Sequence, residues 1–294
     1  MTITTAWADT YWDGTWWRHD PATPGDWFDD ANWTAGVPSL EDSAYVHNSG
    51  IAVIAYGNAL AKQISIMGST LCPYPLEQFH ASTVLQTGGT ATVEQSIYLG
   101  GMNEAPGSYT LIGGRLFTAD ITVGHGLGSG NFTQIGGISN VGGELKVGDL
   151  PYDRSYSLDS SLGTYNLMGG KVSTGRTSVG EAGRGEFIQT GGVHTVEGTL
   201  AIGESRPSQR FYPYPWGAIT NGSDGSVTSN VVYTPSSPSE GRYELSGGQL
   251  STKETVVGER SGQGDFIQTG GVHTVEEALL IGGARAWGCW PLLV

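Results

Sequence analysis

The sequence predicts an all-β protein, a parallel β-solenoid of the right-handed β-helix type with about eight coils and a Trp-rich N-terminal cap. Three observations predict it. Glycine accounts for 47 of the 294 residues, whereas only 14% are charged. Thr, Val, Ile, Tyr and Ser fill the stretches between glycines, and these residues favour strands over helices. Finally, one strand-turn-strand unit occurs seven times between Val84 and Gly282.

The repeated unit has two forms, which we call coil A and coil B. Coil A reads SYTLIGGRLFTADITVG at its first occurrence, and the three copies are Ser108–Gly124, Thr164–Gly180 and Arg242–Gly258. Coil B reads EFIQTGGVHTVEGTLAIG in its third copy, and the four copies are Val84–Gly100, Asn131–Gly148, Glu186–Gly203 and Asp265–Gly282. The order is B, A, B, A, B, A, B, so the true repeat spans two coils.

Each coil alternates apolar with polar residues, as in Tyr109-x-Leu111, and alternation at period two indicates half-buried strands. A Gly-Gly pair interrupts every unit at the same place, as a tight corner with positive φ requires. Without a long insertion the pairs recur every 22 to 25 residues, the coil length of a right-handed parallel β-helix. We therefore expect three short strands and three corners per coil.

The alternation also predicts which side chains point into the coils. An aromatic stack is expected from Tyr109, Phe132, Tyr165, Phe187, Tyr243 and Phe266. Every B coil carries a glutamine where A coils carry leucine, and these glutamines, Gln86, Gln134, Gln189 and Gln268, are expected to bond to free backbone groups of the Gly-Gly corner. The segment Ile51–Gly68 looks like a first coil without that corner.

The two ends differ from the repeats. Six of the nine tryptophans lie in the first 33 residues, namely Trp7, Trp12, Trp16, Trp17, Trp27 and Trp33. We expect residues 1–50 to form an N-terminal cap and assembly region, residues 51–283 the solenoid, and residues 284–294 an apolar C-terminal tail. A parallel solenoid exposes unpaired strand edges at both ends, so each end needs a cover.

Insertions occur only at the corner after a B coil, in residues 101–107, 149–163 and 204–241. Insertions at one corner project from one edge of the rod, where solenoids carry their contacts. Two of them contain side chains suited to sugar rings or to a protein partner, namely Tyr152, Arg154, Tyr156, Arg210, Tyr212, Tyr214 and Trp216. The alternative is that these aromatics pin the loops to the solenoid wall.

The repeat argues against a shared metal or catalytic site. His194 and His273 occupy equivalent positions two coils apart, roughly 10 Å from each other by strand spacing, so they cannot bind one zinc ion. Glu94, Glu197 and Glu276 also lie two or more coils apart and fail as a catalytic carboxylate cluster for the same reason. We therefore predict no catalytic residue, no metal and no cofactor. A polysaccharide lyase or hydrolase stays open as an alternative, with Arg154, Tyr156, Arg206, Arg210 and Tyr212 as its cation and base.

Charge and hydropathy exclude two further classes of protein. The formal charge of −14 would repel nucleic acid. No run of 18 apolar residues exists, which argues against a membrane-spanning helix. The first residues show no basic and apolar secretion signal, so the export route is open. The two cysteines, Cys72 and Cys289, are too few for a disulfide scaffold, and whether they pair is open too.

Two motifs carry a resemblance to a known group of proteins. The repeat has the forms G-x-[YF]-x-L-x-GG and F-x-Q-T-GG-x-x-x-V-x-x-x-L-x-I-G, and the segment WFDDANWTAGVPSLEDSAYV spans Trp27–Val46. Both resemble Gly-Gly-repeat β-solenoids of bacterial extracellular proteins, of the autotransporter-adhesin and PEP-CTERM-associated type. The resemblance covers nearly the whole chain and implies a surface or extracellular location.

The leading hypothesis is therefore an extracellular structural or adhesive solenoid that assembles with itself head to tail into a fibre or surface layer. In it, the C-terminal tail docks on the Trp-rich region of the next copy. The assembly contact would use Trp7, Trp12, Trp16, Trp17, Trp287, Cys289, Trp290, Leu292 and Leu293. The alternatives are a protein that binds or degrades carbohydrate, surface polysaccharide being its partner, and a receptor-binding spike.

Overall fold

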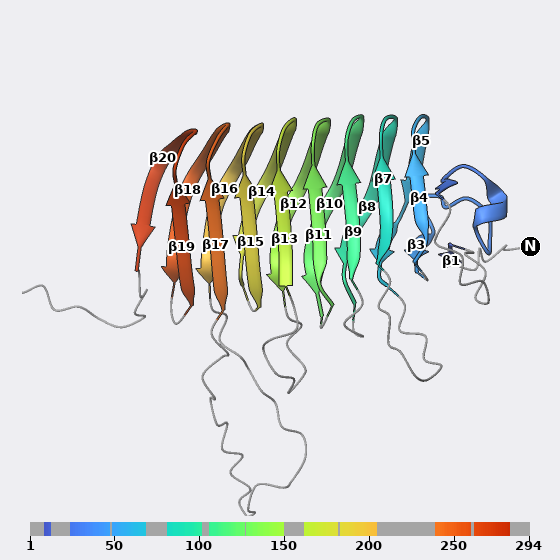
Figure 1. The fold of residues 1–294 in the computed structure, drawn as a ribbon, viewed down its shortest axis with the longest axis horizontal. Coiled ribbons are helices and arrows are strands. Elements are labelled where there is room, and N and C mark those ends of the chain that lie inside the picture. The colour runs from blue at the N-terminus through green and yellow to red at the C-terminus, as the bar shows by residue number, and fades with distance from the viewer. Residues whose placement is uncertain are drawn as a thin grey trace, which may run out of the picture.

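The computed structural model describes residues 9–12, 24–47, 49–68, 81–101, 106–126, 128–149, 162–181, 183–204, 239–259 and 262–282. These residues form a rod of stacked coils in which every coil contributes to two parallel β-sheets (Figure 1). Eight coils succeed one another from β4 to β20. The predicted fold class, a parallel β-solenoid, is confirmed.

The larger sheet has eleven strands, and each pairs in parallel with the equivalent strand of the next coil. Its order is β1 (Thr10–Tyr11), β3 (Ser43–Val46), β6 (Gln63–Ile66), β8 (Thr90–Leu99), β10 (Arg115–His125), β12 (Ile138–Asp149), β14 (Lys171–Val179), β16 (Val193–Glu204), β18 (Gln249–Glu259) and β20 (Val272–Ile281), with β5 (Asn58–Ala61) also beside β8.

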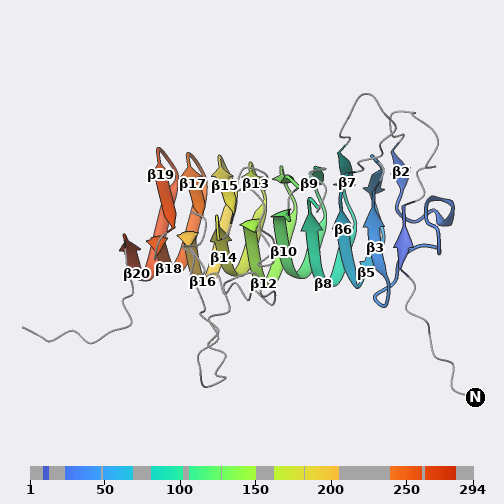
Figure 2. The same ribbon diagram turned by 90° about the horizontal axis from the view of Figure 1, so that it is seen from below.

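The smaller sheet has nine strands and runs along the opposite wall of the coils. Its order is β19 (Gln263–Gln268), β17 (Glu240–Leu245), β15 (Arg184–Gln189), β13 (Leu162–Leu167), β11 (Gly130–Gln134), β9 (Gly107–Leu111), β7 (Ser82–Gln86), β4 (Ile51–Ile54) and β2 (Gly25–Asp26). Seen from below, β19 and β20 stand together at one end of the rod and β2 and β3 at the other (Figure 2).

The expectation of three strands per coil was wrong, because the repeated coils have two. Where a third corner was expected, the long strand bends without breaking, as the register shift between Thr118 and Ile121 shows. Side chains hold this bend: Thr118 donates to the carbonyl of Asp120 over 3.0 Å, and Oδ1 of Asp120 accepts from the backbone N–H of Glu144 over 2.7 Å. The bend is therefore a bulge within a strand, which alternation at period two does not reveal.

The Gly-Gly corners behave as predicted. The second glycine has positive φ in all seven, namely Gly89, Gly114, Gly137, Gly170, Gly192, Gly248 and Gly271. The corners also stack so closely that a Cβ on Gly170 would lie 2.4 Å from the carbonyl oxygen of Gly137. Both conditions admit only glycine. The first coil, which has no Gly-Gly pair, turns at Gly57 with φ of 69°.

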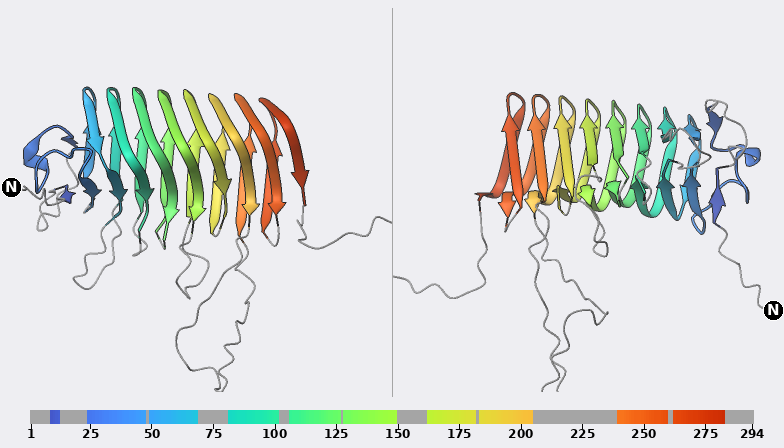
Figure 3. Two further views of the ribbon diagram at one scale, coloured as in Figure 1. Left: turned by 180° about the vertical axis from the view of Figure 1, so that it is seen from behind. Right: turned by 60° about the horizontal axis from the view of Figure 1, so that its bottom comes forward.

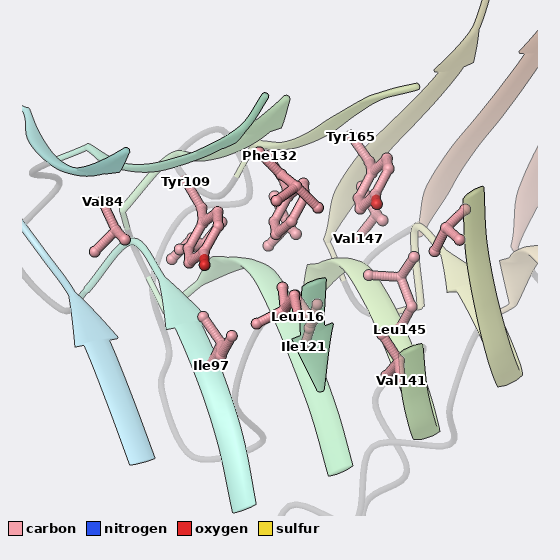
Figure 4. Packing of buried hydrophobic residues seen from close by; sticks show 14 of the residues in the cluster. Val84, Ile97, Tyr109, Leu116, Ile121, Phe132, Val141, Leu145, Val147 and Tyr165 are labelled. Carbon is pink, nitrogen blue, oxygen red and sulfur yellow. The ribbon is translucent and has the colours of Figure 1, made fainter. Parts of the chain in front are cut away.

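The core is a row of side chains between the two sheets, and the predicted aromatic stack runs through it. Tyr109, Phe132 and Tyr165 lie one above the next (Figure 4), with ring centroids 5.0 and 4.7 Å apart. Phe187, Tyr243 and Phe266 continue the stack at 4.7, 4.6 and 5.6 Å. Coil stacking and ring stacking thus share one period, which lets each ring meet its neighbours in the next coils.

Three tryptophans close the N-terminal end. Trp12 and Trp27 both pack edge-on against Trp33, with centroids 5.0 and 4.8 Å apart, and Trp33 donates its indole N–H to the carbonyl of Trp27 over 2.8 Å. A 3₁₀ turn, η1 (Asp30–Asn32), lies in the chain between Trp27 and Trp33. Because β2 pairs with β4 and β3 with β6, the cap is built as a partial coil.

Candidate functional site at the C-terminal coil

Each junction from a B coil to the next A coil contains a buried amide-phenol pair. The tyrosine of the A coil donates its hydroxyl to Oε1 of the glutamine before it, at 2.6 Å for Tyr109–Gln86, 2.8 Å for Tyr165–Gln134 and 2.7 Å for Tyr243–Gln189. Burial raises the pKa of the Tyr109 and Tyr165 phenols, which keeps them protonated as donors.

The amide nitrogen of each glutamine completes the junction. Nε2 donates to a backbone carbonyl of the next coil, that of the residue which follows the Gly-Gly pair there. These residues are Arg115, Lys171 and Gln249, at 2.9, 3.0 and 2.9 Å. Nε2 also donates to a carbonyl of the glutamine's own corner, that of Gly88, Gly137 or Gly192. The predicted inward direction and corner bonding are therefore confirmed for these three buried glutamines. The tyrosines were predicted as part of the aromatic stack, but their hydrogen bonds to the glutamines were missed, although the alternation of Tyr in A coils with Phe in B coils was a readable signal.

His194 adds a third member at the junction between β16 and β18. Its Nδ1 lies 2.9 Å from the Tyr243 hydroxyl, and its Nε2 lies 3.2 Å from the Thr177 hydroxyl. The ring stacks on Phe187 at 4.8 Å. Burial lowers the pKa of His194 to about 3, so the ring is neutral near neutral pH. One hydroxyl, that of Tyr243, thus serves both Gln189 and His194.

The last coil carries the same inward residues, but they are exposed. Leu200 and Ile202 of β16 are 0% and 1% exposed, whereas their equivalents Leu279 and Ile281 of β20 are 52% and 74% exposed. Within the described residues no strand pairs with the outer edge of β19 or β20. Figure 3 shows β20 as the last strand at this end of the rod. Among the described residues the C-terminal coil therefore presents two unpaired strand edges and several apolar side chains that are buried in the other coils.

Gln268 and His273 repeat the Gln189–His194 pair on this open coil. Nε2 of Gln268 donates to the carbonyl of Gly271 over 3.3 Å, and Nε2 of His273 lies 3.3 Å from the hydroxyls of Thr252 and Thr255. Partial burial lowers the pKa of His273. Among the described residues no phenol reaches these two side chains. The described part of this coil therefore has the glutamine and the histidine of a junction but no tyrosine hydroxyl beside them.

Ion pairs cross three coils near the edge from which the insertions leave. Lys146 lies 3.7 Å from Glu144 and 3.7 Å from Glu181, and Arg176 pairs with Glu144 at 3.2 Å and with Glu204. These pairs link β12, β14 and β16 on the outer face of the larger sheet. These ion pairs connect neighbouring coils, so the group stabilises the stacking of the coils.

The structure leaves most of the predicted contact residues undescribed. Trp12 is only 5% exposed and packs inside the cap, so its ring is not free for a contact. The other predicted assembly residues, Trp7, Trp16, Trp17, Trp287, Cys289, Trp290, Leu292 and Leu293, lie outside the described residues, as do the predicted glycan contacts Tyr152, Arg154, Tyr156, Arg210, Tyr212, Tyr214 and Trp216.

Metal ligands do not gather anywhere in the described residues, which contain no group of three or more His, Cys, Asp or Glu side chains that could hold a metal ion. No helix in the described part of the chain has the length and apolar character that crossing a bilayer requires.

The fold and this end surface define the class of the protein as a parallel β-solenoid in which no described strand pairs with the outer edge of the last described coil. Comparison of the chain with protein-family models, curated proteins and solved structures found no match.

Proposed function

We propose that this chain is an extracellular structural rod that is lengthened end to end, at its C-terminal coil, by further β-solenoid coils. The observation that carries the proposal is the exposure of inward-facing side chains on the last coil, with Leu279 and Ile281 at 52% and 74%. Each such side chain gains roughly 1.5–3 kcal/mol on full burial. The free edges of β19 and β20 add backbone hydrogen-bonding groups that a further strand pair would satisfy.

The topology supports copies of the chain as one source of such coils. The outermost described strands at the two ends belong to the same two sheets: β1 and β20 end the larger sheet, β2 and β19 the smaller. At the N-terminal end Thr34 bonds both backbone groups of Tyr11, and Asn32 donates to the carbonyl of Asp26, so a partner would meet the cap there and not two bare strand edges. A copy displaced along the rod axis therefore brings its cap, with β1 and β2, over β20 and β19. Such a heterologous contact repeats without closing and yields a fibre.

The extracellular setting and the adhesive role rest on the resemblance of the Gly-Gly repeats and on the acidic composition. Docking of residues 284–294 on the Trp-rich region of the next copy belongs to the same proposal. Because Trp12 is buried within the cap, such a contact would depend on the remaining tryptophans of residues 1–50.

Charged side chains at the exposed end test the proposal. In the double variant Leu279→Lys, Ile281→Glu, sedimentation velocity and negative-stain microscopy should show single rods, while the wild type forms end-joined rods as concentration rises. The control variant Ile135→Lys, Met168→Glu changes two residues that are 47% and 55% exposed on the side of the rod, and it should assemble normally. Wild-type rods that stay single, or fibres unaffected by the end variant, would contradict assembly from copies.

A further inference from the structure

We infer that the C-terminal coil is a receptor for a coil of the A form, presented by another solenoid chain, whose tyrosine hydroxyl completes Gln268 and His273. This inference rests on the proposed function insofar as that function makes the C-terminal coil a junction. It goes further, because it states the sequence that a partner must carry.

The three internal junctions supply the rule. Gln86, Gln134 and Gln189 each accept from the tyrosine of the next A coil, at 2.6–2.8 Å. The last coil repeats the third B coil almost residue for residue, as FIQTGGVHTVE at both Phe187–Glu197 and Phe266–Glu276. The surface that Tyr243 recognises between β15 and β16 is therefore present again on β19 and β20.

The Gly-Gly corner sets a second requirement. A Cβ on Gly248 of the A coil would lie 2.4 Å from the carbonyl oxygen of Gly192 in the coil below. The same approach over Gly271 admits only glycine. The partner must therefore combine both features in the order Tyr-x-Leu-x-Gly-Gly, the order found at Tyr243–Gly248.

The larger sheet then fixes the apolar contacts. In the existing junction β16 pairs with β18 so that His194 lies beside Leu250 and Ile202 beside Val257. In the same register, a leucine of the partner covers His273 and a valine covers Ile281. The apolar side chains that are now exposed on β20 thus acquire the neighbours that their equivalents already have.

Two other occupants lack the required hydroxyl. In the N-terminal cap of a second copy, Gly25 stands in the tyrosine column, because Gly25 pairs with Ala52, Ala52 with Val84 and Val84 with Tyr109. Its strands β1 and β2 are also only two residues long. Residues 283–294 contain no tyrosine. Either occupant would leave Gln268 and His273 without their phenol.

The test uses the full chain and two synthetic peptides that differ by one oxygen atom. The first peptide has the sequence of residues 239–259, and the second carries Tyr243→Phe, which keeps the ring but removes the hydroxyl. Calorimetry should show that the tyrosine peptide binds one site per chain, about tenfold more tightly than the phenylalanine peptide, since burying an unpaired amide costs about one decade in affinity.

The chain variant Gln268→Leu isolates the amide. Leucine occupies this position in A coils, as Leu245 does, and Gln268 is exposed, so the variant should unfold at the wild-type temperature. Its preference for the tyrosine peptide should be smaller than that of the wild type, because only His273 is left to pair with the phenol. In NMR titrations of the wild type, the tyrosine peptide should also lower the pKa of His273 further, as burial does for His194.

Equal affinity of the two peptides for the wild type, or no binding of either, would overturn the inference. A preference for tyrosine that is as large in Gln268→Leu as in the wild type would overturn it too. These outcomes can be told apart from those of the assembly experiment. If the rods form fibres but do not bind the peptides, the proposed function holds and the inference is wrong. If the rods stay single but bind the tyrosine peptide more tightly, the inference holds and only assembly from copies of the chain is wrong.

Discussion

The phenol of Tyr165 donates a 2.8 Å hydrogen bond to Oε1 of Gln134, a residue of the preceding coil that lies 31 positions earlier in the chain. Both side chains are fully buried. The bond makes the two faces of a coil different: a B coil offers an amide to the coil after it, and an A coil offers a phenol to the coil before it.

Removing that hydroxyl should weaken the junction. Tyr165→Phe leaves Oε1 of Gln134 buried without a donor, and we expect the free energy of unfolding in urea to fall by about 1–3 kcal/mol. The double variant Tyr165→Phe, Gln134→Leu removes both partners and should lose less than the sum of the single losses. Additive losses would show that the bond contributes nothing of its own.

His194 should make the solenoid sensitive to acid. Its pKa is about 3 in the folded chain and about 6.5 when unfolded. Between these values the unfolded chain binds the additional proton, so stability is full above about pH 6.5 and falls by about 1.4 kcal/mol per unit as the pH drops.

Replacing His194 by leucine, the residue that the neighbouring A coil has at Leu250, should remove this part of the slope. Urea unfolding measured from about pH 7 to about pH 5 compares the two chains, while their carboxylates contribute equally to both. Parallel curves for wild type and variant would exclude the histidine as the cause.

The corner glycines should tolerate no side chain. Gly170 has φ of 76°, and its Cβ would overlap the carbonyl of Gly137, so Gly170→Ala should cost about 3 kcal/mol or prevent folding. Gly142→Ala is the control, because a Cβ there meets only the carbonyl oxygen of Thr118 at 3.9 Å. The control should melt within a few degrees of the wild type, and equal melting of both variants would refute the corner argument.

The bend in the long strands should depend on an acceptor at residue 120. Asp120→Ala removes the partner of the Glu144 N–H, and we expect a loss of about 1 kcal/mol in unfolding free energy. Asp120→Asn keeps an oxygen in place and should retain most of the stability. If asparagine and alanine behave alike, the bond does not hold the bend.

The sequence allowed the coils, the corners and the aromatic stack to be predicted, because each arises from a local rule. Positive φ at Gly114 or Gly137 arises from a glycine pair that recurs at fixed spacing, and the stacking of Tyr109 on Phe132 arises from alternation at period two. The inward direction of Gln134 had the same origin.

Other features depend on contacts between coils, which alternation within one strand does not specify. The bulge near Asp120 was mistaken for a corner, because its stabilising bond goes to Glu144 in the next coil. The link from Gln134 to Tyr165 was missed for the same reason. The order of the coils did predict that the last described coil is of the B form, which carries the glutamine Gln268.

The pairing of amide with phenol also restricts how such a chain can change in length. Losing or gaining a single coil would place two glutamines, or two tyrosines, in successive layers and would leave buried polar atoms without partners. Losing or gaining an adjacent A and B together preserves every contact. An insertion or deletion that preserves every contact must therefore contain an even number of coils, and variants of the chain should differ in length by steps of two coils.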